Sequence, residues 1–214
     1  MSLLVDVRQL YKSYPGSEHP VLNNFSMSLT PGSLNALVGP SGVGKTTLLN
    51  CLSGLDGWQS GSIHLGSHVM NPSDLRSSSL FRRQYIGLTF QDPRLLPEFT
   101  VLENVLIPMK LDGGWDEVWG KSLLHEVGCD DLADRFPHQL SGGQAARIGL
   151  ARAMVRKPSL WLLDEPTGNL DPVTADLITN FIHKLHQNLK PTTLIVTHNN
   201  VLAHICERQI SLTN

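Results

Sequence analysis

Residues Gly39 to Thr46 follow the spacing G-x-x-x-x-G-K-T, which is typical of a loop that binds phosphate groups. Glycines at these positions let the backbone wrap closely around a triphosphate, so that successive N–H groups form a concavity for anions. We expect the Lys45 ammonium to reach the β- and γ-phosphates and the Thr46 hydroxyl to bind Mg2+. The candidate nucleotide-binding residues of this stretch are Gly39, Pro40, Ser41, Gly42, Val43, Gly44, Lys45, Thr46 and Thr47.

A glycine-rich surface turn would give similar letters, so the neighbouring segments decide between the two interpretations. Leu34–Val38 reads as a buried strand before the loop, and Thr47–Leu52 reads as an apolar helix after it. A strand, a loop and a helix in this order are the setting that a phosphate-binding loop requires. The helix would also direct the positive end of its dipole at the phosphates.

Polar residues that suit phosphate chemistry stand at the ends of three further expected strands. Gln91 follows Tyr85–Phe90, Asp164 and Glu165 follow the apolar run 159–163, and His198 comes soon after 192–196. In a parallel sheet the carboxyl ends of the strands meet at one edge, where ligands bind. We expect Asp164 to hold the hydration shell of Mg2+, Gln91 to position Mg2+ or a water, and Glu165 to act as general base. Each residue taken alone would also fit a solvated turn.

A second candidate anion site lies at Leu140-Ser141-Gly142-Gly143-Gln144, which opens an expected helix. Ser141 and Gln144 have the spacing of a capping box, which is sufficient local chemistry to explain the pair. The same geometry presents free N–H groups and a positive dipole to an anion in front of the helix. The two interpretations are compatible.

Two tyrosines precede the phosphate-binding loop, and composition alone makes either one an ordinary strand aromatic. Tyr11 and Tyr14 flank a short polar stretch between the expected strands 5–10 and 25–29. Their position ahead of the loop adds a second possibility, which is stacking on the base of a nucleotide.

Composition limits the classes of protein to consider. The chain has 214 residues, a net charge of −2 and three widely separated cysteines, so bulk attraction to nucleic acid and a disulfide scaffold are both disfavoured. No apolar run approaches the roughly 20 residues that span a bilayer. Nine histidines are present, and we interpret His183 and His186 as surface residues rather than metal ligands.

Secondary-structure patterns divide the chain into parts that contain strands and a helical block. A further strand is expected at Ser60–Leu65, and the polar stretch Asn71–Ser79 is expected to be a surface connection. From residue 92 to 157 the pattern becomes helical, with helices expected at 101–109, 115–127 and 141–155. Apolar Leu95, Leu96 and Phe99 lie in a stretch that otherwise resembles a loop. Asp171 and Pro172 are expected to cap and start another helix.

Taken together, these motifs resemble the ATP-binding subunits of ABC transporters over essentially the whole chain. The resemblance assigns Gly39–Thr46 to Walker A, Gln91 to the Q-loop, Leu140–Gln144 to the signature motif and Asp164 to Walker B. It also assigns Glu165 as the catalytic glutamate, Asn169-Leu170-Asp171 as the D-loop, His198 as the switch histidine and Tyr14, rather than Tyr11, as the aromatic of the A-loop. Nucleotide-binding roles for Ser141, Gly142, Gly143, Gln144 and Asp171 follow from the same resemblance.

The resemblance implies an α/β fold of the P-loop NTPase type, forming one ABC ATP-binding domain over residues 1–214. Its parts would be a RecA-like parallel-sheet core with an N-terminal antiparallel β subdomain, at about 1–91 and 158–214, and an inserted α-helical subdomain at 92–157. It implies ATP and Mg2+ as cofactors and a head-to-tail homodimer with ATP between Walker A and the partner's signature motif. It further implies transmembrane permease subunits as partners, at the cytoplasmic face of the inner membrane, and no nucleic acid.

Within this family, Phe90–Pro97 and Pro166–Asp171 resemble the bacterial branch of lipoprotein-release, macrolide-export and cell-division ATPases. The chain departs from the family pattern at Ala146, where Gln is common, and at Asn199, where Asp is common. A soluble ABC ATPase that acts on nucleic acid is the main alternative, and a P-loop small-molecule kinase is a third. The transported cargo and its direction do not follow from these residues.

Overall fold

The N-terminal part of the chain forms an antiparallel sheet. The computed structural model describes residues 2–168 and 170–213, with the backbone alone for Leu75. The strands lie in the order β2-β1-β4-β5, and Val5 of β1 is paired with Leu29 on one side and with Leu65 on the other. These strands are β1 (Val5–Lys12), β2 (Leu22–Leu29), β4 (Ser60–Leu65) and β5 (His68–Val69).

A second, parallel sheet forms the centre of the molecule. Its strands lie in the order β6-β7-β8-β3-β9, and each neighbouring pair is parallel. The carboxyl ends of all these strands therefore meet at one edge, as the sequence predicts for Gln91, Glu165 and His198. The strands are β3 (Leu34–Val38), β6 (Ile86–Leu88), β7 (Leu160–Asp164), β8 (Thr192–Val196) and β9 (Arg208–Ser211).

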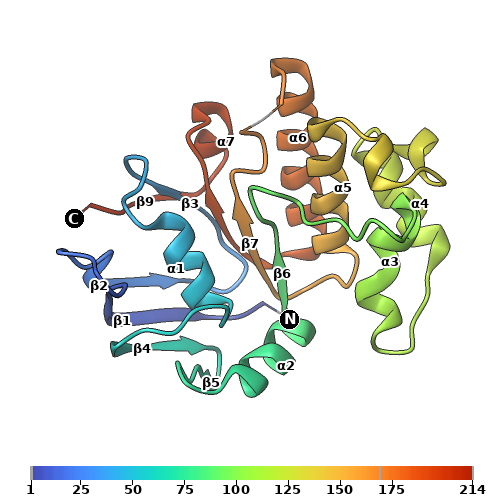
Figure 1. Cartoon of the computed structure of the whole chain (residues 1–214). Coiled ribbons are helices and arrows are strands. Elements are labelled where there is room, and N and C mark those ends of the chain that lie inside the picture. The colour runs from blue at the N-terminus through green and yellow to red at the C-terminus, as the bar shows by residue number, and fades with distance from the viewer. Residues whose placement is uncertain (1, 169, 214) are drawn as a thin grey trace.

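Helices cover both faces of the parallel sheet. In Figure 1, α1 lies between the two sheets, α5 and α6 lie on the other side of β7, and α3 and α4 lie farthest from the antiparallel sheet. The helices are α1 (Lys45–Leu52), α2 (Leu75–Tyr85), α3 (Val101–Lys110), α4 (Glu117–Glu126), α5 (Gly142–Met154), α6 (Pro172–Leu189) and α7 (Asn200–His204), with short 3-10 turns η1 (Asp130–Leu132) and η2 (Pro137–Gln139).

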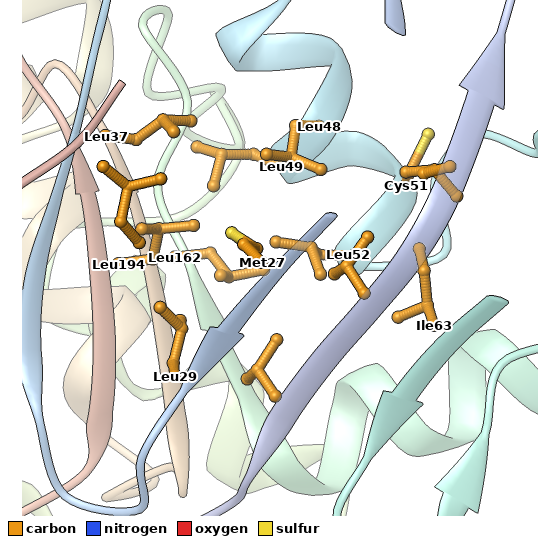
Figure 2. Packing of buried hydrophobic residues seen from close by; sticks show 14 of the residues in the cluster. Met27, Leu29, Leu37, Leu48, Leu49, Cys51, Leu52, Ile63, Leu162 and Leu194 are labelled. Carbon is orange, nitrogen blue, oxygen red and sulfur yellow. The ribbon is translucent and has the colours of Figure 1, made fainter. Parts of the chain in front are cut away.

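Alternation along the buried strands builds two apolar cores. Leu160 and Leu162 of β7 belong to the core shared with α1 and the antiparallel sheet, whereas Trp161 and Leu163 belong to the core shared with α3–α6. This follows from the two-residue period of a strand whose faces are both covered. Figure 2 shows the first core, where Met27 and Leu29 meet side chains of α1, β7 and β8.

The ABC-type ATPase fold predicted from the sequence is confirmed in its two sheets and its helical block. The second core runs without interruption from α3 and α4 to β7 and α6. A subdomain boundary near residues 92 and 157 stays a prediction. Of the described helices, none is both long enough and apolar enough to cross a bilayer.

Three local predictions were wrong. The stretch Asn71–Ser79 is not a plain surface connection, because α2 begins within it, capped by Asp74, whose side chain accepts a bond of 2.9 Å from the N–H of Ser77. The strand expected at Tyr85–Phe90 is shorter, since α2 continues through Tyr85 and β6 covers Ile86–Leu88 only. Tyr85 and Phe81 pack against the first core. This tertiary contact is not evident from the sequence, because the neighbouring residues are polar.

The third concerns His186, which is buried rather than at the surface. Its Nδ1 lies 3.1 Å from the hydroxyl of Thr193, and its ring meets Trp161 edge-on. Burial lowers the pKa of His186, as expected for an imidazole that is neutral inside the protein. His183, one turn earlier on α6, is exposed as predicted.

Candidate active site

The phosphate-binding loop connects β3 to α1, and its glycines are required by the protein's own packing. Gly44 is the N-cap of α1 with φ 108°, and a Cβ there would lie 2.7 Å from Val21 Cγ1 and 2.8 Å from the Val21 carbonyl oxygen. A Cβ on Gly39 would lie 2.4 Å from the Leu212 carbonyl oxygen. The sequence analysis explained these glycines by the need to wrap the backbone around a triphosphate. At Gly39 and Gly44 a side chain is already excluded by contacts within the chain itself.

Lys45 and Thr46, the first residues of α1, direct their polar groups at different neighbours. The Lys45 ammonium donates hydrogen bonds of 2.7 Å and 2.8 Å to the carbonyl oxygens of Gly39 and Pro40. The Thr46 hydroxyl donates a bond of 2.9 Å to Oδ2 of Asp164 at the end of β7. Burial raises the pKa of Asp164, while the Thr46 bond and the charge of Lys45 act in the opposite direction.

Glu165 and His198 meet across the ends of β7 and β8. The backbone N–H of His198 donates a bond of 3.2 Å to Glu165 Oε2, and His198 Nε2 lies 3.2 Å from Oε1. Oε1 is buried and has no hydrogen bond of acceptable geometry to any described residue, so its capacity to accept one is unused. Burial raises the pKa of Glu165, and the neighbouring His198 lowers it in part. Glu165 holds a positive φ of 45°, which fixes its direction at the strand end.

These groups converge on a pocket of about 710 Å3. Gln91, Asp164, Glu165 and His198 share it with the phosphate-binding loop and with Tyr14, whereas Tyr11 is not among its lining residues. The pocket is lined by Tyr14, Val21, Ser41, Gly42, Gly44, Lys45, Thr46, Thr47, Gln91, Asp164, Glu165, Thr167, Gly168, Val196, His198 and Asn199.

The residues that line the pocket match the predicted binding residues only in part. Gly39, Pro40 and Val43 belong to the loop but do not line the pocket, and Val43 is buried in the first core. Thr167 and Asn199 line it although the sequence analysis gave them no binding role. Asn199 Nδ2 donates a bond of 3.3 Å to the Thr167 hydroxyl, a contact between segments that only the fold brings together. Thr167 and Asn199 could have been predicted from the sequence by their position close to motif residues.

The signature segment lies outside this pocket. Ser141 and Gln144 form the predicted capping box of α5: Ser141 accepts from the Gln144 N–H at 3.3 Å, and Gln144 accepts from the Ser141 N–H at 2.9 Å. A Cβ on Gly142 would have no atom of any described residue within 4 Å. Asp171 caps α6 and likewise does not line the pocket. Asn169 of the predicted D-loop lies outside the described residues.

Hydroxyl, carboxylate and amide oxygens at one corner of the pocket suit a hard divalent cation. Thr46 and Asp164 already lie within hydrogen-bonding distance, and Gln91 lines the same pocket. Oxygen ligands of this kind are those that Mg2+ prefers. The donor set therefore fits Mg2+.

A parallel sheet, a phosphate-binding loop at the edge of that sheet and a buried carboxylate beside it define the class of P-loop nucleotide hydrolases. The comparisons with known proteins narrow this class. The family model described as "ABC transporter" matches residues 22–168. The chain belongs to the ABC transporter family, and it is an ATP-binding and ATP-hydrolysing subunit.

Relatives match along nearly the whole chain. The lipoprotein-releasing system ATP-binding protein LolD 1 of Rhodopirellula baltica is 40% identical over 97% of this chain and 93% of its own length. LolD of Geobacter metallireducens is 40% identical over 100% and 97%. The ABC transporter ATP-binding protein YxdL of Bacillus subtilis is 37% identical over 98% and 83%. The predicted branch of the family is thereby confirmed.

A solved structure also matches nearly the whole chain. The dimeric post-hydrolysis state of the ATP-binding cassette MJ0796, bound to ADP and Pi, superimposes with a TM-score of 0.92 at 32% identity, covering 98% of this chain and 94% of that one. The similar proteins are named for transport rather than for work on nucleic acid, so the nucleic-acid alternative is not favoured.

Proposed function

We propose that the chain acts as a head-to-tail homodimer whose two ATP sites are each completed by the partner's signature segment. The observation that carries the proposal is the separation of two anion sites. Lys45 and Glu165 line the pocket, whereas Ser141, Gly142 and Gly143 open α5 outside it. A helix N-terminus with an open face suits a phosphate supplied by another subunit. The dimeric form of the similar cassette supports this arrangement.

Each residue of the pocket then has a defined task. Lys45 and the N–H groups of α1 bind the β- and γ-phosphates, and Tyr14 offers its ring to the adenine. Thr46, Asp164 and Gln91 would hold Mg2+, which would neutralise charge on the phosphate oxygens. Glu165 accepts the proton of the attacking water, because a partly buried carboxylate with a raised pKa is a stronger base than an exposed one. His198 holds Glu165 in place and faces the γ-phosphate.

Hydrolysis is coupled to movement through the segment that follows Gln91. Arg152 of α5 donates hydrogen bonds to the carbonyl oxygens of Pro93 and, at 2.9 Å, of Arg94. Gly149 of α5 permits the same close approach, because a Cβ there would lie 2.9 Å from Pro93 Cβ. The segment is thus fastened to the signature helix two to three residues after Gln91, which lines the pocket.

The partners that fit this segment are transmembrane permease subunits, which would hold the chain at the cytoplasmic face of the membrane. Leu96 is exposed on the segment, whereas Leu95 packs against the second core. We assign the contact with these partners to the segment because it lies between the pocket and the signature helix. Because the relatives are named for lipoprotein release, we assign lipoproteins as the cargo class. Depletion of the chain should then leave lipoproteins in the membrane where they are made.

The shared sites are tested by mixing two inactive variants. In a head-to-tail dimer of a Ser141→Arg subunit with a Lys45→Ala subunit, both lesions fall on one site and the other site is complete. We expect ATPase activity in the mixture and almost none in either variant alone. A mixture as inactive as its components, or full wild-type activity at dilutions where only monomer exists, contradicts the proposal.

A further inference from the structure

The ring of Tyr14 is held by two charged residues that the assigned motifs do not include. The Tyr14 hydroxyl donates a hydrogen bond of 2.7 Å to Asp56 Oδ2, and the other carboxylate oxygen of Asp56 accepts a bond of 2.6 Å from the Lys12 ammonium. The same ammonium lies 4.5 Å from the centroid of the Tyr14 ring and donates a bond of 2.7 Å to the carbonyl oxygen of Gly57. Lys12 is buried, whereas Tyr14 is 39% exposed and lines the pocket.

The backbone that carries Tyr14 is fixed by the same loop, residues 53–59, which connects α1 to β4. The side chain of Gln59 pairs with Ser13 on both sides: its Oε1 accepts from the Ser13 N–H at 3.0 Å, and its Nε2 donates to the Ser13 carbonyl at 2.9 Å. The Gln59 N–H also donates to the carbonyl oxygen of Tyr11 at 3.0 Å. The connection therefore fixes both the backbone before Tyr14 and the ring itself.

We propose that Asp56 and Lys12 are positioning residues that hold the Tyr14 ring as a rigid platform for adenine. The inference rests on the proposed contact between Tyr14 and the base. The Lys12 ammonium lies over one face of the ring, and Tyr14 lines the pocket whereas Lys12 does not, which leaves the opposite face for the base. A cation on one face of an aromatic ring draws electron density toward it. The free face then repels the π-electrons of adenine less and stacks more strongly.

Charge balance in this cluster keeps the carboxylate ionised. Burial acts to raise the pKa of Asp56, but the bonds from Lys12 and Tyr14 hold that pKa below its ordinary value. The tether is therefore a hydrogen bond to a charged acceptor, which is stronger than a bond between neutral groups. It restricts the ring before ATP arrives, so that less conformational entropy is lost on binding.

The placement of the loop also links the two halves of the nucleotide site. Lys45 and Thr46 stand at the N-terminus of α1, and the loop with Asp56 follows its C-terminus. The helix, with its buried side chains in the first core, sets the distance between the phosphate groups and the base platform. Thr47 adds a direct contact, since its hydroxyl lies 3.4 Å from the hydroxyl of Tyr14.

The test compares a ligand that has a base with one that does not. Affinities for ATP and for inorganic tripolyphosphate are measured for the wild type, Asp56→Ala and Tyr14→Phe. The phenylalanine variant removes only the hydroxyl of an exposed residue and covers the case in which Asp56→Ala folds poorly. Glu126→Gln is the matched control, because Glu126 forms an ion pair of 2.7 Å with Lys184 and does not line the pocket.

We expect Asp56→Ala and Tyr14→Phe each to weaken ATP binding on the order of three- to tenfold, a part of the roughly 5- to 150-fold that a whole base stack contributes. Tripolyphosphate affinity should stay at the wild-type value in both variants, as should all values for Glu126→Gln. The double variant should be no weaker than the stronger single one, because both changes break the same tether.

Equal losses for ATP and tripolyphosphate would overturn the inference, since they would show a general effect through α1. Unchanged ATP binding in Asp56→Ala and Tyr14→Phe would overturn it as well. Tyr14→Ala separates this inference from the proposal beneath it. If Tyr14→Ala leaves ATP affinity unchanged, the base platform itself fails; if it weakens ATP while Asp56→Ala does not, only the positioning role fails.

Discussion

Replacement of Lys45 by alanine removes the one charged group of the phosphate-binding loop. The Lys45 side chain is buried, and within residues 2–168 and 170–213 its ammonium makes hydrogen bonds only to the neutral carbonyl groups of Gly39 and Pro40. Folding gains little from such a buried charge, because the cost of desolvation offsets the two bonds. We therefore expect Lys45→Ala to fold as well as the wild type and to lose its affinity for the phosphates.

The size of the loss follows from the number of contacts. A hydrogen bond to a charged group contributes about 1.5–3 kcal/mol, and the ammonium can donate to two phosphate oxygens in place of its two carbonyls. The sum of about 3–6 kcal/mol corresponds to a loss in ATP affinity of about 10²- to 10⁴-fold. The charge of Lys45 also lowers the pKa values of Asp164 and Glu165, so both should rise further in the variant.

Two measurements check this account. Titration with ATP gives the affinity, and thermal unfolding with and without ATP gives the stabilisation by ligand, which is about 2.7 kcal/mol at 100 times Kd for the wild type. Lys45→Ala should melt within a few degrees of the wild type without nucleotide and gain nothing from added ATP. Lys121→Ala, on the exposed face of α4, is the control. ATP affinity within about threefold of the wild type would refute the reasoning, since it would leave the lysine no phosphate contact.

Three further predictions concern the carboxylates and the signature helix. Because burial raises the pKa of Asp164, its ionisation disfavours the folded state, and Asp164→Asn should raise Tm at pH 7 by about 2–4 °C. This gain should vanish as the pH falls below about 3, where the carboxyl is protonated in both the folded and the unfolded state. The raised pKa of Glu165 places the acidic limb of the kcat–pH profile above the ordinary range of a glutamate. His198→Ala should move this limb to still higher pH, because it removes a charge that lowers the pKa of Glu165. An unmoved limb in kinetic assays would contradict the contact between His198 and Glu165. Gly142→Ala should stabilise the monomer by about 0.5–1 kcal/mol in denaturant titrations, since the added Cβ meets no atom of the described residues within 4 Å. The same substitution should lower ATPase activity about tenfold or more by obstructing the partner's phosphate, and retained activity would argue against a shared site.

The sequence predicts the central part of the site well, because fixed spacing and strand order determine it. Gln91, Glu165 and His198 are far apart along the chain, but each follows a strand of one parallel sheet. Parallel strands place their carboxyl ends at one edge, so three separate local patterns become one prediction about space. The capping box of Ser141 and Gln144 is equally local, and the structure contains it as predicted.

The features that the sequence does not reveal depend on contacts between distant segments. The helix α2 is masked by its polar composition, and its place is set by Phe81, which stacks on His68 at 4.2 Å between ring centroids. His186 looks like a surface residue until Thr193 of the neighbouring strand is placed beside it. Asp56 is an unremarkable loop residue until the fold brings it to the hydroxyl of Tyr14.

The central claim is that Glu165 is the base of a site that two subunits close around ATP. Glu165→Gln keeps the size of the side chain and removes the carboxylate, so ATP binding should survive while the chemical step slows. The variant should then elute from a sizing column as a stable dimer with ATP and Mg2+ and as a monomer with ADP, with hydrolysis reduced by about 10²-fold or more. Hydrolysis at the wild-type rate, or a monomer with ATP and Mg2+, would contradict the claim.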